Sequence, residues 1–249
     1  MVKDSQTMTN PASRRPSAAP LPLVLVPGLN CTAELFGPQM AAFSERHPIS
    51  VADHVTDDSI AAIARRLLAA APPRFALAGL SMGGYIALEV MRQAPQRVDR
   101  LALLDTRASA DAPEDTEIRL AAIKFAETGR FDDIHGILWP RLVHIKRLGD
   151  TDLEAVVRRM ADKTGPGRFI RQQRAVMARP DFLPGLAAIR CPTLVLVGED
   201  DAITPRFMSE DMADAIAGAE LVVVPDCGHL STLERPQAVN AALEGWLAA

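Results

Sequence analysis

The chain has little of what holds small secreted proteins or metal centres together. Its 249 residues contain only three cysteines, Cys31, Cys191 and Cys227, and no CxxC pair. An odd number of widely spaced cysteines argues against a disulfide framework and against a zinc site. The sequence therefore favours a cytoplasmic location, and we expect Cys31 and Cys227 to be packing residues.

Long apolar runs and a strong excess of one charge are also missing. The longest apolar runs have the length of strands, so no segment is expected to span a membrane. A net charge of −4 offers no basic surface for nucleic acid. We expect a small-molecule substrate and neither a nucleic-acid nor a membrane partner, while the choice between monomer and dimer stays open.

The beginning of the chain lacks both an apolar segment and a regular hydrophobic period. Residues 1–20 are rich in Ser, Thr, Pro and Ala, which predicts a disordered tail rather than a signal peptide. Over the whole chain, 48% of residues are hydrophobic and 23% are charged, which is typical of a soluble globular enzyme.

Short apolar runs alternate with helical patterns along most of the remaining chain. Strands are predicted over residues 23–26, 49–52, 75–78, 101–104, 193–197 and 221–224, and helices over residues 59–71, 85–93, 206–217 and 236–247. Nearly continuous apolar runs are typical of strands covered on both faces. The predicted fold class is therefore α/β, with a doubly wound, mostly parallel sheet of about six strands.

One long stretch interrupts this alternation. Residues 111–188 show only helical periods, over residues 113–128, 131–138, 152–164 and 167–178. An all-helical insertion of this length between two strands is typical of a cap. We expect a core formed by residues 21–110 and 189–249, with the cap over residues 111–188.

The segment Gly79–Gly84 carries the strongest chemical signal. Ser81 stands between an apolar, strand-like run and a helical pattern, in a G-x-S-x-G sequence. This is the sequence form of a nucleophile elbow, a strained turn in which nothing larger than glycine fits at Gly79 and Gly83. The alternative is a glycine-rich turn that merely closes tightly, and the segment alone does not separate the two.

Two later loops supply residues that could activate Ser81. A serine hydroxyl needs a base, and the base needs an anion that fixes its tautomer. Asp201 follows the predicted strand 193–197 and His229 follows the strand 221–224. Taken alone, Asp201 could be a turn residue and His229 a packed loop histidine. Their joint occurrence in the order serine, acid, histidine favours a catalytic triad.

The elbow and two further patterns resemble the α/β-hydrolase superfamily, in particular its small esterase, enol-lactonase and carbon–carbon hydrolase branch. The two patterns are Gly198-x-x-Asp201-x-x-x-Pro205 and Gly228-His229-x-x-x-x-Glu234-x-Pro236. The resemblance implies Ser81 as nucleophile, His229 as base and Asp201, rather than Asp200, as the orienting acid. It also implies a sheet that lacks the family's usual first two strands, because only the predicted tail precedes the first apolar run.

The resemblance further implies an oxyanion hole. One N–H would come from Met82, directly after the nucleophile, and the other from Leu29, in the loop after the first predicted strand. Pro27 stands where the family usually has a histidine, so a side chain that braces this loop is missing. The amide of Asn30 is a candidate substrate contact, although a turn residue is an equal alternative.

A Ser-His-Asp set supports acyl transfer, in which an acyl-enzyme forms on the serine and water then releases it. We expect a serine hydrolase that cleaves a small to medium carboxylic ester and needs no metal or cofactor. The alternatives are a carbon–carbon bond hydrolase or enol-lactonase with the same triad, a cofactor-free perhydrolase, and a slow-turnover ligand receptor.

The substrate is expected to depend on the cap. Candidate pocket residues are Trp139, Leu142 and Phe169, which could equally form the cap's own core. Residues that could bind a carboxylate are Arg141, His144 and Arg168, for which solvated surface is the alternative.

Overall fold

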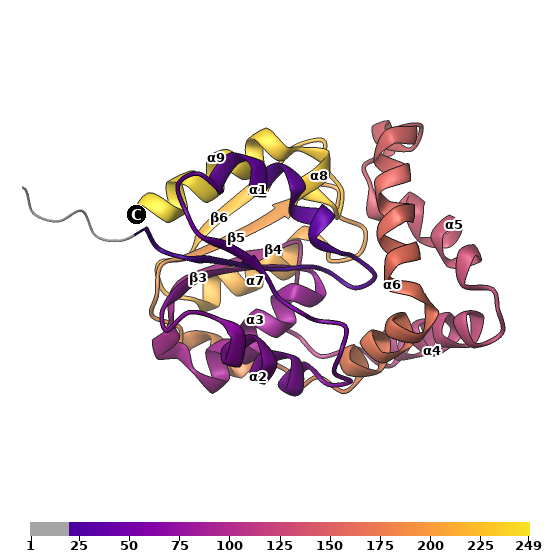
Figure 1. The fold of residues 1–249 in the computed structure, drawn as a ribbon, viewed down its shortest axis with the longest axis horizontal. Helices are drawn as coiled ribbons and strands as arrows, with labels where there is room; N and C mark the ends of the chain where they lie inside the picture. The colour runs from indigo at the N-terminus through magenta and orange to yellow at the C-terminus, as the bar shows by residue number, and fades with distance from the viewer. Residues whose placement is uncertain (1–19) are drawn as a thin grey trace, which may run out of the picture.

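The structure, a computed structural model, describes residues 20–249. The predicted tail therefore falls, apart from Pro20, outside the described residues. Within them, six strands form one sheet in the order β2-β1-β3-β4-β5-β6, and every neighbouring pair is parallel (Figure 1). The strands are β1 (Leu23–Val26), β2 (Ile49–Val51), β3 (Phe75–Leu80), β4 (Val98–Leu104), β5 (Thr193–Gly198) and β6 (Glu220–Val224). The predicted fold class is confirmed.

The sheet is covered on both faces, which explains the nearly continuous apolar runs. One face carries α2 (Ile60–Ala70), α3 (Met82–Gln93) and α7 (Arg206–Ala215), and the other carries α1 (Gly37–Phe43), α8 (Ser231–Glu234) and α9 (Pro236–Ala248) (Figure 1). All residues of the inner strands β1, β3 and β5 are buried. Alternate residues of each strand contribute to two separate apolar cores, one under each helical layer.

Local sequence signals account for some of the element ends. The Ser59 hydroxyl accepts a hydrogen bond from the Ala62 N–H and caps the start of α2. The helix after the elbow begins at Met82, three residues before its predicted start, because the elbow turns directly into it. Two short helices, α1 and α8, were not predicted, since each is too short to show a helical period. Short 3-10 helices occur at Ala33–Phe36, Pro95–Arg97, Ile145–Arg147 and Leu183–Ala188.

Between β4 and β5 the described chain forms helices and no strand. These helices are α4 (Pro113–Glu127), α5 (Phe131–Leu142) and α6 (Thr151–Met177). The backbone of α6 is interrupted at Gly165, with φ 70° and ψ 164°, so its two halves correspond to the two helices predicted on either side of Gly165-Pro166. We call α4–α6 and their connections the helical insertion. It lies beyond the carboxyl ends of the strands (Figure 1).

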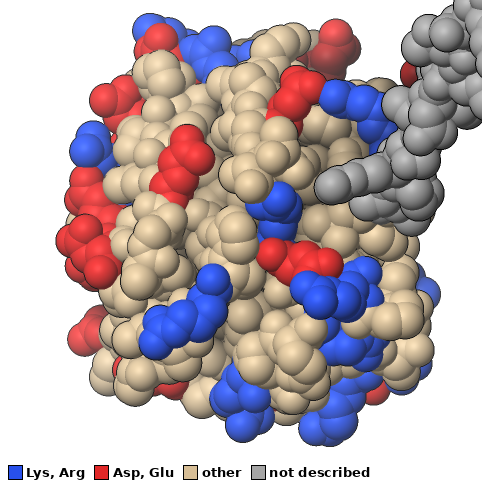
Figure 2. Space-filling view, turned by 90° about the vertical axis from the view of Figure 1, so that its left-hand side faces the viewer, with Lys and Arg blue, Asp and Glu red and all other residues tan. Residues whose placement is uncertain are grey.

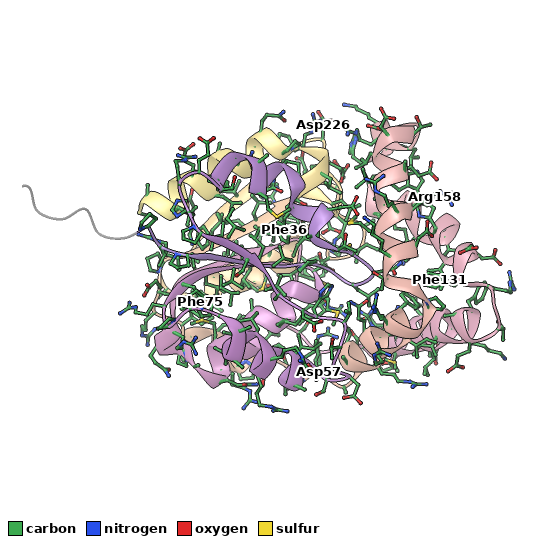
Figure 3. The ribbon with its side chains drawn as sticks, in the orientation of Figure 1. Phe36, Asp57, Phe75, Phe131, Arg158 and Asp226 are labelled. Carbon is green, nitrogen blue, oxygen red and sulfur yellow. The ribbon has the colours of Figure 1, made fainter. Side chains whose placement is uncertain are left out.

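The helical insertion has a small apolar core of its own. The rings of Phe131 and Phe169 meet edge to face, with centroids 5.4 Å apart. Figure 3 shows Phe131 at the far end of the molecule from Phe75, which begins β3. The insertion is therefore held partly by its own contacts and partly by the loops of the sheet.

The side of the molecule opposite the insertion is a mixed surface. Figure 2 shows acidic and basic side chains interspersed there among wide uncharged areas. In the part of the chain that the structure describes, no helix is both long and apolar enough to cross a membrane.

Candidate active site

Ser81 occupies a strained position between β3 and α3. Its backbone has φ 55° and ψ −117°, a region that costs a non-glycine residue roughly 1–3 kcal/mol. Two hydrogen bonds hold this turn: the Ser81 N–H donates to the Leu104 carbonyl at 3.0 Å, and the Thr106 hydroxyl donates to the Ser81 carbonyl at 2.8 Å. The end of β4 thus fixes a turn that the serine would not adopt by itself.

The glycines around Ser81 are required by close packing. A Cβ at Gly79 would overlap the Gly83 carbonyl, and a Cβ at Gly83 would overlap the Val26 carbonyl. Both contacts are with backbone atoms, which cannot move aside as a flexible side chain can. The prediction that only glycine fits at these two positions is confirmed.

Asp201 and His229 form a buried hydrogen-bonded pair. The Nδ1 atom of His229 lies 2.8 Å from Oδ2 of Asp201, and the two side chains are 4% and 0% exposed. The other oxygen of Asp201 accepts the N–H groups of Ile203 and Thr204 at 2.8 and 2.9 Å, and the Thr204 hydroxyl donates to Oδ2 at 2.7 Å. These donors fix the carboxylate so that it faces the imidazole.

This environment adjusts the basicity of His229. Burial alone would lower the pKa of the imidazole, but the charge of Asp201 and its hydrogen bond outweigh burial and raise the pKa above its usual value. Burial likewise opposes the charge of Asp201, yet His229 and the loop donors hold the pKa of that carboxyl below its usual range. The pair is therefore arranged as an ionised acid beside a base.

A second buried carboxyl, Asp105, lies next to this pair and was not predicted from the sequence. It follows β4, has φ 42° and is completely buried. Its Oδ1 accepts the Gly198 N–H at 2.9 Å, and its Oδ2 accepts the hydroxyl of Ser231. Burial and the neighbouring charge of Asp201 raise the pKa of Asp105 to about 8. Asp105 thus joins the loop of the acid to the loop of the histidine.

Glu234 organises the loop of His229 and connects it to the helical insertion. Its Oε1 accepts the N–H of Gly228 at 3.0 Å, and its Oε2 accepts the N–H of His144 at 2.7 Å. The N–H of His229 donates to the carbonyl of Leu142 at 3.0 Å. This explains the glutamate in the Gly228–Pro236 pattern, because its carboxylate accepts hydrogen bonds from buried backbone N–H groups in two segments.

The loop after β1 lies against the elbow and is braced from two sides. A Cβ at Gly28 would lie 3.5 Å from the Cβ of Ser81. His54 lies 3.1 Å from the Gly28 carbonyl through Nε2, which must donate because a carbonyl only accepts. The Asn30 N–H donates to Oε1 of Gln172, a buried residue of α6, at 2.9 Å. The bracing that Pro27 cannot supply comes from His54 and Gln172, which were not predicted.

One cavity of about 350 Å³ brings most of these residues together. The predicted catalytic, oxyanion and pocket residues on its wall are Leu29, Asn30, Ser81, Met82, Leu142 and His229. Asp201 is not on the wall because it lies behind His229. A volume of this size is within the range of sites for small ligands.

Two predicted pocket residues lie elsewhere. Trp139 is buried, donates from Nε1 to the Leu148 carbonyl at 3.1 Å and stacks on His135. Phe169 is fully buried against Phe131. Neither lines the cavity, because both rings stabilise the helical insertion itself. The alternative reading, that apolar residues at helical spacing form the cap's own core, describes these two correctly.

The three residues predicted to bind a carboxylate lie in different environments. Arg141 lines the cavity and donates to the Ala202 carbonyl at 3.0 Å. His144 is buried near Asp200, and Arg168 is an exposed residue that donates to the Lys163 carbonyl. Two other arginines, Arg107 and Arg119, line the cavity and were not predicted.

Two of the cysteines lie at the site: Cys31 is on the cavity wall, and Cys227 stands two residues before His229. Cys31 is buried and burial raises the pKa of its thiol to about 12, while burial also raises the pKa of the Cys227 thiol. Both thiols therefore stay protonated and unreactive at neutral pH. Among residues 20–249, no group of three or more His, Cys, Asp or Glu side chains is placed to hold a metal ion.

Residues 23–242 match the pattern of the Alpha/beta hydrolase family. The chain belongs to the alpha/beta hydrolase family. It is 31% identical over 179 residues to BpoC of Mycobacterium tuberculosis, covering 70% of this chain and 67% of that protein.

Two further relatives of this alpha/beta hydrolase are similar over most of its length. It is 27% identical to the (E)-2-((N-methylformamido)methylene)succinate hydrolase of Acinetobacter baylyi, covering 91% of this chain and 90% of that one. The structure of a thermophilic esterase from Thermogutta terrifontis, with malate bound, superposes with a TM-score of 0.84 at 30% identity, covering 92% of this chain and 89% of that one. The chain is accordingly a hydrolase.

Proposed function

We propose that this protein is a serine hydrolase that cleaves small to medium carboxylic esters through an acyl-enzyme on Ser81. The observation that carries the proposal is the buried His229–Asp201 hydrogen bond, 2.8 Å long, beside a strained Ser81 on the wall of the same cavity. A nucleophile, a base and an orienting acid are thereby available at one place.

Each residue has a role in the proposed reaction. His229 accepts the Ser81 proton as the hydroxyl attacks the ester carbonyl, and Asp201 stabilises the imidazolium that forms. The N–H groups of Leu29 and Met82 receive the negative charge on the carbonyl oxygen. His229 then protonates the leaving alcohol, and a water molecule, activated by the same base, releases the acid product.

The names of two relatives support this reaction class, since one is an esterase and one is a hydrolase. We also propose that residues 111–188 act as a cap over a core of residues 21–110 and 189–249. In this arrangement α4 and α5 supply cavity residues while the sheet loops supply the reacting groups.

The proposal is tested by hydrolysis of a chromogenic ester series of increasing acyl length. We expect activity in the wild type, a loss of about 10³-fold or more in Ser81→Ala, and no change in the surface control Ser44→Ala. A fluorophosphonate should label Ser81 in the wild type and in Ser44→Ala. Ester hydrolysis that persists in Ser81→Ala would contradict the proposal, and activity confined to a vinylogous diketone would favour carbon–carbon bond hydrolysis.

A further inference from the structure

Part of the wall of the Ser81 cavity is formed by arginines. Arg107, two residues after Asp105, and Arg119, on α4, both line the cavity. A third arginine, Arg179, lies behind them with a side chain that is 0% exposed. We call these three residues, with Asp111 and Asp115, the arginine cluster.

The cluster carries more positive than negative charge. Asp111 accepts hydrogen bonds from all three arginines, at 2.7 Å from Arg107, 2.6 Å from Arg119 and 2.6 Å from Arg179. Burial opposes the charge of Asp111, but the guanidinium groups of Arg119 and Arg179 hold the pKa of its carboxyl below the usual range. Asp115 is the second carboxylate and accepts from Arg107 at 2.7 Å. Three cations and two anions leave one positive charge uncompensated within the cluster.

Arg107 has hydrogen-bonding capacity that the protein does not use. Only its Nη2 atom donates to the carboxylates of the cluster. The residue is 7% exposed, and its Nη1 atom makes no hydrogen bond among residues 20–249 and, unlike the unpaired Nε atom, is not fully enclosed. An unpaired guanidinium N–H that is not enclosed, on a residue of the cavity wall, can pair with an acceptor that arrives with the ligand.

Arg107 and Ser81 line the same cavity and lie in segments that contact each other. Thr106, the neighbour of Arg107, donates its hydroxyl to the carbonyl of Ser81 at 2.8 Å. Tyr85, one turn into α3 from Ser81, lines the cavity as well. A ligand of the size of the cavity can therefore contact Ser81 and Arg107 at the same time.

We propose that the natural substrate carries a second, ionised carboxylate, which is bound by Arg107 and Arg119. The inference rests on the proposed ester hydrolysis, for which it names a substrate class: half-esters of dicarboxylic acids or esters of carboxylated alcohols. The excess charge compensates the carboxylate, and the planar guanidinium groups match its two oxygens. Arg119 completes the contact, since its side chain is 20% exposed and lies on the same wall.

The experiment compares matched pairs of chromogenic esters. Mono-4-nitrophenyl adipate against 4-nitrophenyl hexanoate places the carboxylate on the acyl side. The butyrate ester of 3-carboxy-4-nitrophenol against 4-nitrophenyl butyrate places it on the alcohol side. The readout is the ratio of kcat/KM for the charged ester to that for its neutral partner. Because this ratio is measured within one protein preparation, the folded fraction cancels.

The expected change in this ratio differs among four variants. Arg107→Gln should lower it about 10-fold to 100-fold for one of the two pairs, as expected for a lost charged hydrogen bond. Arg119→Gln removes the second guanidinium group, on the more exposed of the two side chains, and should also lower the ratio. Asp115→Asn removes a competing anion and should raise it. Arg168→Gln, an exposed arginine away from the cavity, should leave it unchanged.

Equal ratios in the wild type and in Arg107→Gln for both pairs would overturn the inference, while the proposed function would stand. A preference that survives in Arg107→Gln and disappears in Arg141→Gln would also overturn it. If no ester is hydrolysed, the proposed function fails, and binding of adipate is then measured by calorimetry. Saturable binding that is lost in Arg107→Gln supports the inference, and no binding at millimolar adipate refutes it.

Discussion

Asp105 and Ser231 are hydrogen-bonded across 126 residues of sequence. This contact joins the end of β4 to the loop that carries His229, while the other oxygen of Asp105 holds the start of the Asp201 loop through Gly198. A carboxyl that supports both loops helps to position His229, and it is not on the cavity wall. This arrangement lowers the stability of the fold when both groups are ionised, because the buried carboxyls of Asp105 and Asp201 lie close together.

The first prediction concerns the charge of Asp105. Its pKa is about 8 in the folded protein against an ordinary value of 3.8, so the folded state binds its proton more tightly than the unfolded state. The stability it contributes is present below pH 4 and is lost as the pH rises towards 8. Asp105→Asn keeps an acceptor for Gly198 and a donor for Ser231 but cannot ionise. The Tm of Asp105→Asn should therefore rise relative to the wild type between pH 5 and pH 9, in parallel thermal unfolding series, and a difference that is constant with pH would contradict this.

The second prediction separates Asp201 from its neighbour. Asp201 raises the pKa of His229, so Asp201→Asn should move the acidic limb of kcat/KM to lower pH, since the base then stays neutral in more acidic solution. Ester hydrolysis should also fall by about 10³-fold to 10⁴-fold, because the tautomer of His229 is no longer fixed. Asp200→Asn is the matched control, with a side chain that is 54% exposed. A larger loss in Asp200→Asn would reassign the acid.

The third prediction concerns the crossing of the elbow and β1. In Gly83→Ala the added methyl would overlap the Val26 carbonyl, which is backbone. We expect a loss of more than ~3 kcal/mol in the free energy of unfolding, above the usual range for overpacking. Gly245→Ala is the control, because Gly245 lies in α9 with open space around it. It should gain up to ~1 kcal/mol in chemical denaturation, and equal effects of the two variants would show that the crossing is not tight.

The fourth prediction concerns the brace of the oxyanion loop. Burial lowers the pKa of His54, so the imidazole is neutral and its Nε2–H can hold the Gly28 carbonyl. His54→Leu removes that donor and should lower kcat by about tenfold, less than the loss of a complete oxyanion donor. KM should change little, because the substitution removes a support of the loop and no group that is proposed to bind the ester. His47→Leu is the control, since His47 bonds to the Leu21 carbonyl instead. A fall in KM with unchanged kcat would argue against this role.

The sequence predicted the features that leave a local pattern. The G-x-S-x-G turn, the parallel strands and the break of α6 at Gly165-Pro166 all depend on neighbouring residues, and the structure contains each of them. The spacing between Gly198 and Asp201 is also a pattern of neighbouring residues. A Cβ at Gly198 would overlap the carbonyl of Gly228, so this glycine stands where the two candidate catalytic loops cross.

The residues that were missed act through contacts that are distant in sequence. Asp105, His54 and Arg107 each stand alone in a loop, where a single polar residue has no period and no spacing to interpret. The cavity-facing side of the insertion could not be predicted for another reason. Its helices bury apolar residues both against each other and around the cavity, so hydrophobic spacing does not distinguish Phe169 from Leu142.

The hydrogen bonds from His229 to Leu142 and from His144 to Glu234 have a mechanical consequence. These bonds tie the end of α5 to the loop of the histidine. An opening of the insertion that keeps both bonds would have to displace α4 and the start of α5 instead. A movement large enough to carry residues 142–144 outward would also move His229 away from Ser81. A ligand that entered in this way would therefore meet a serine without its proposed base.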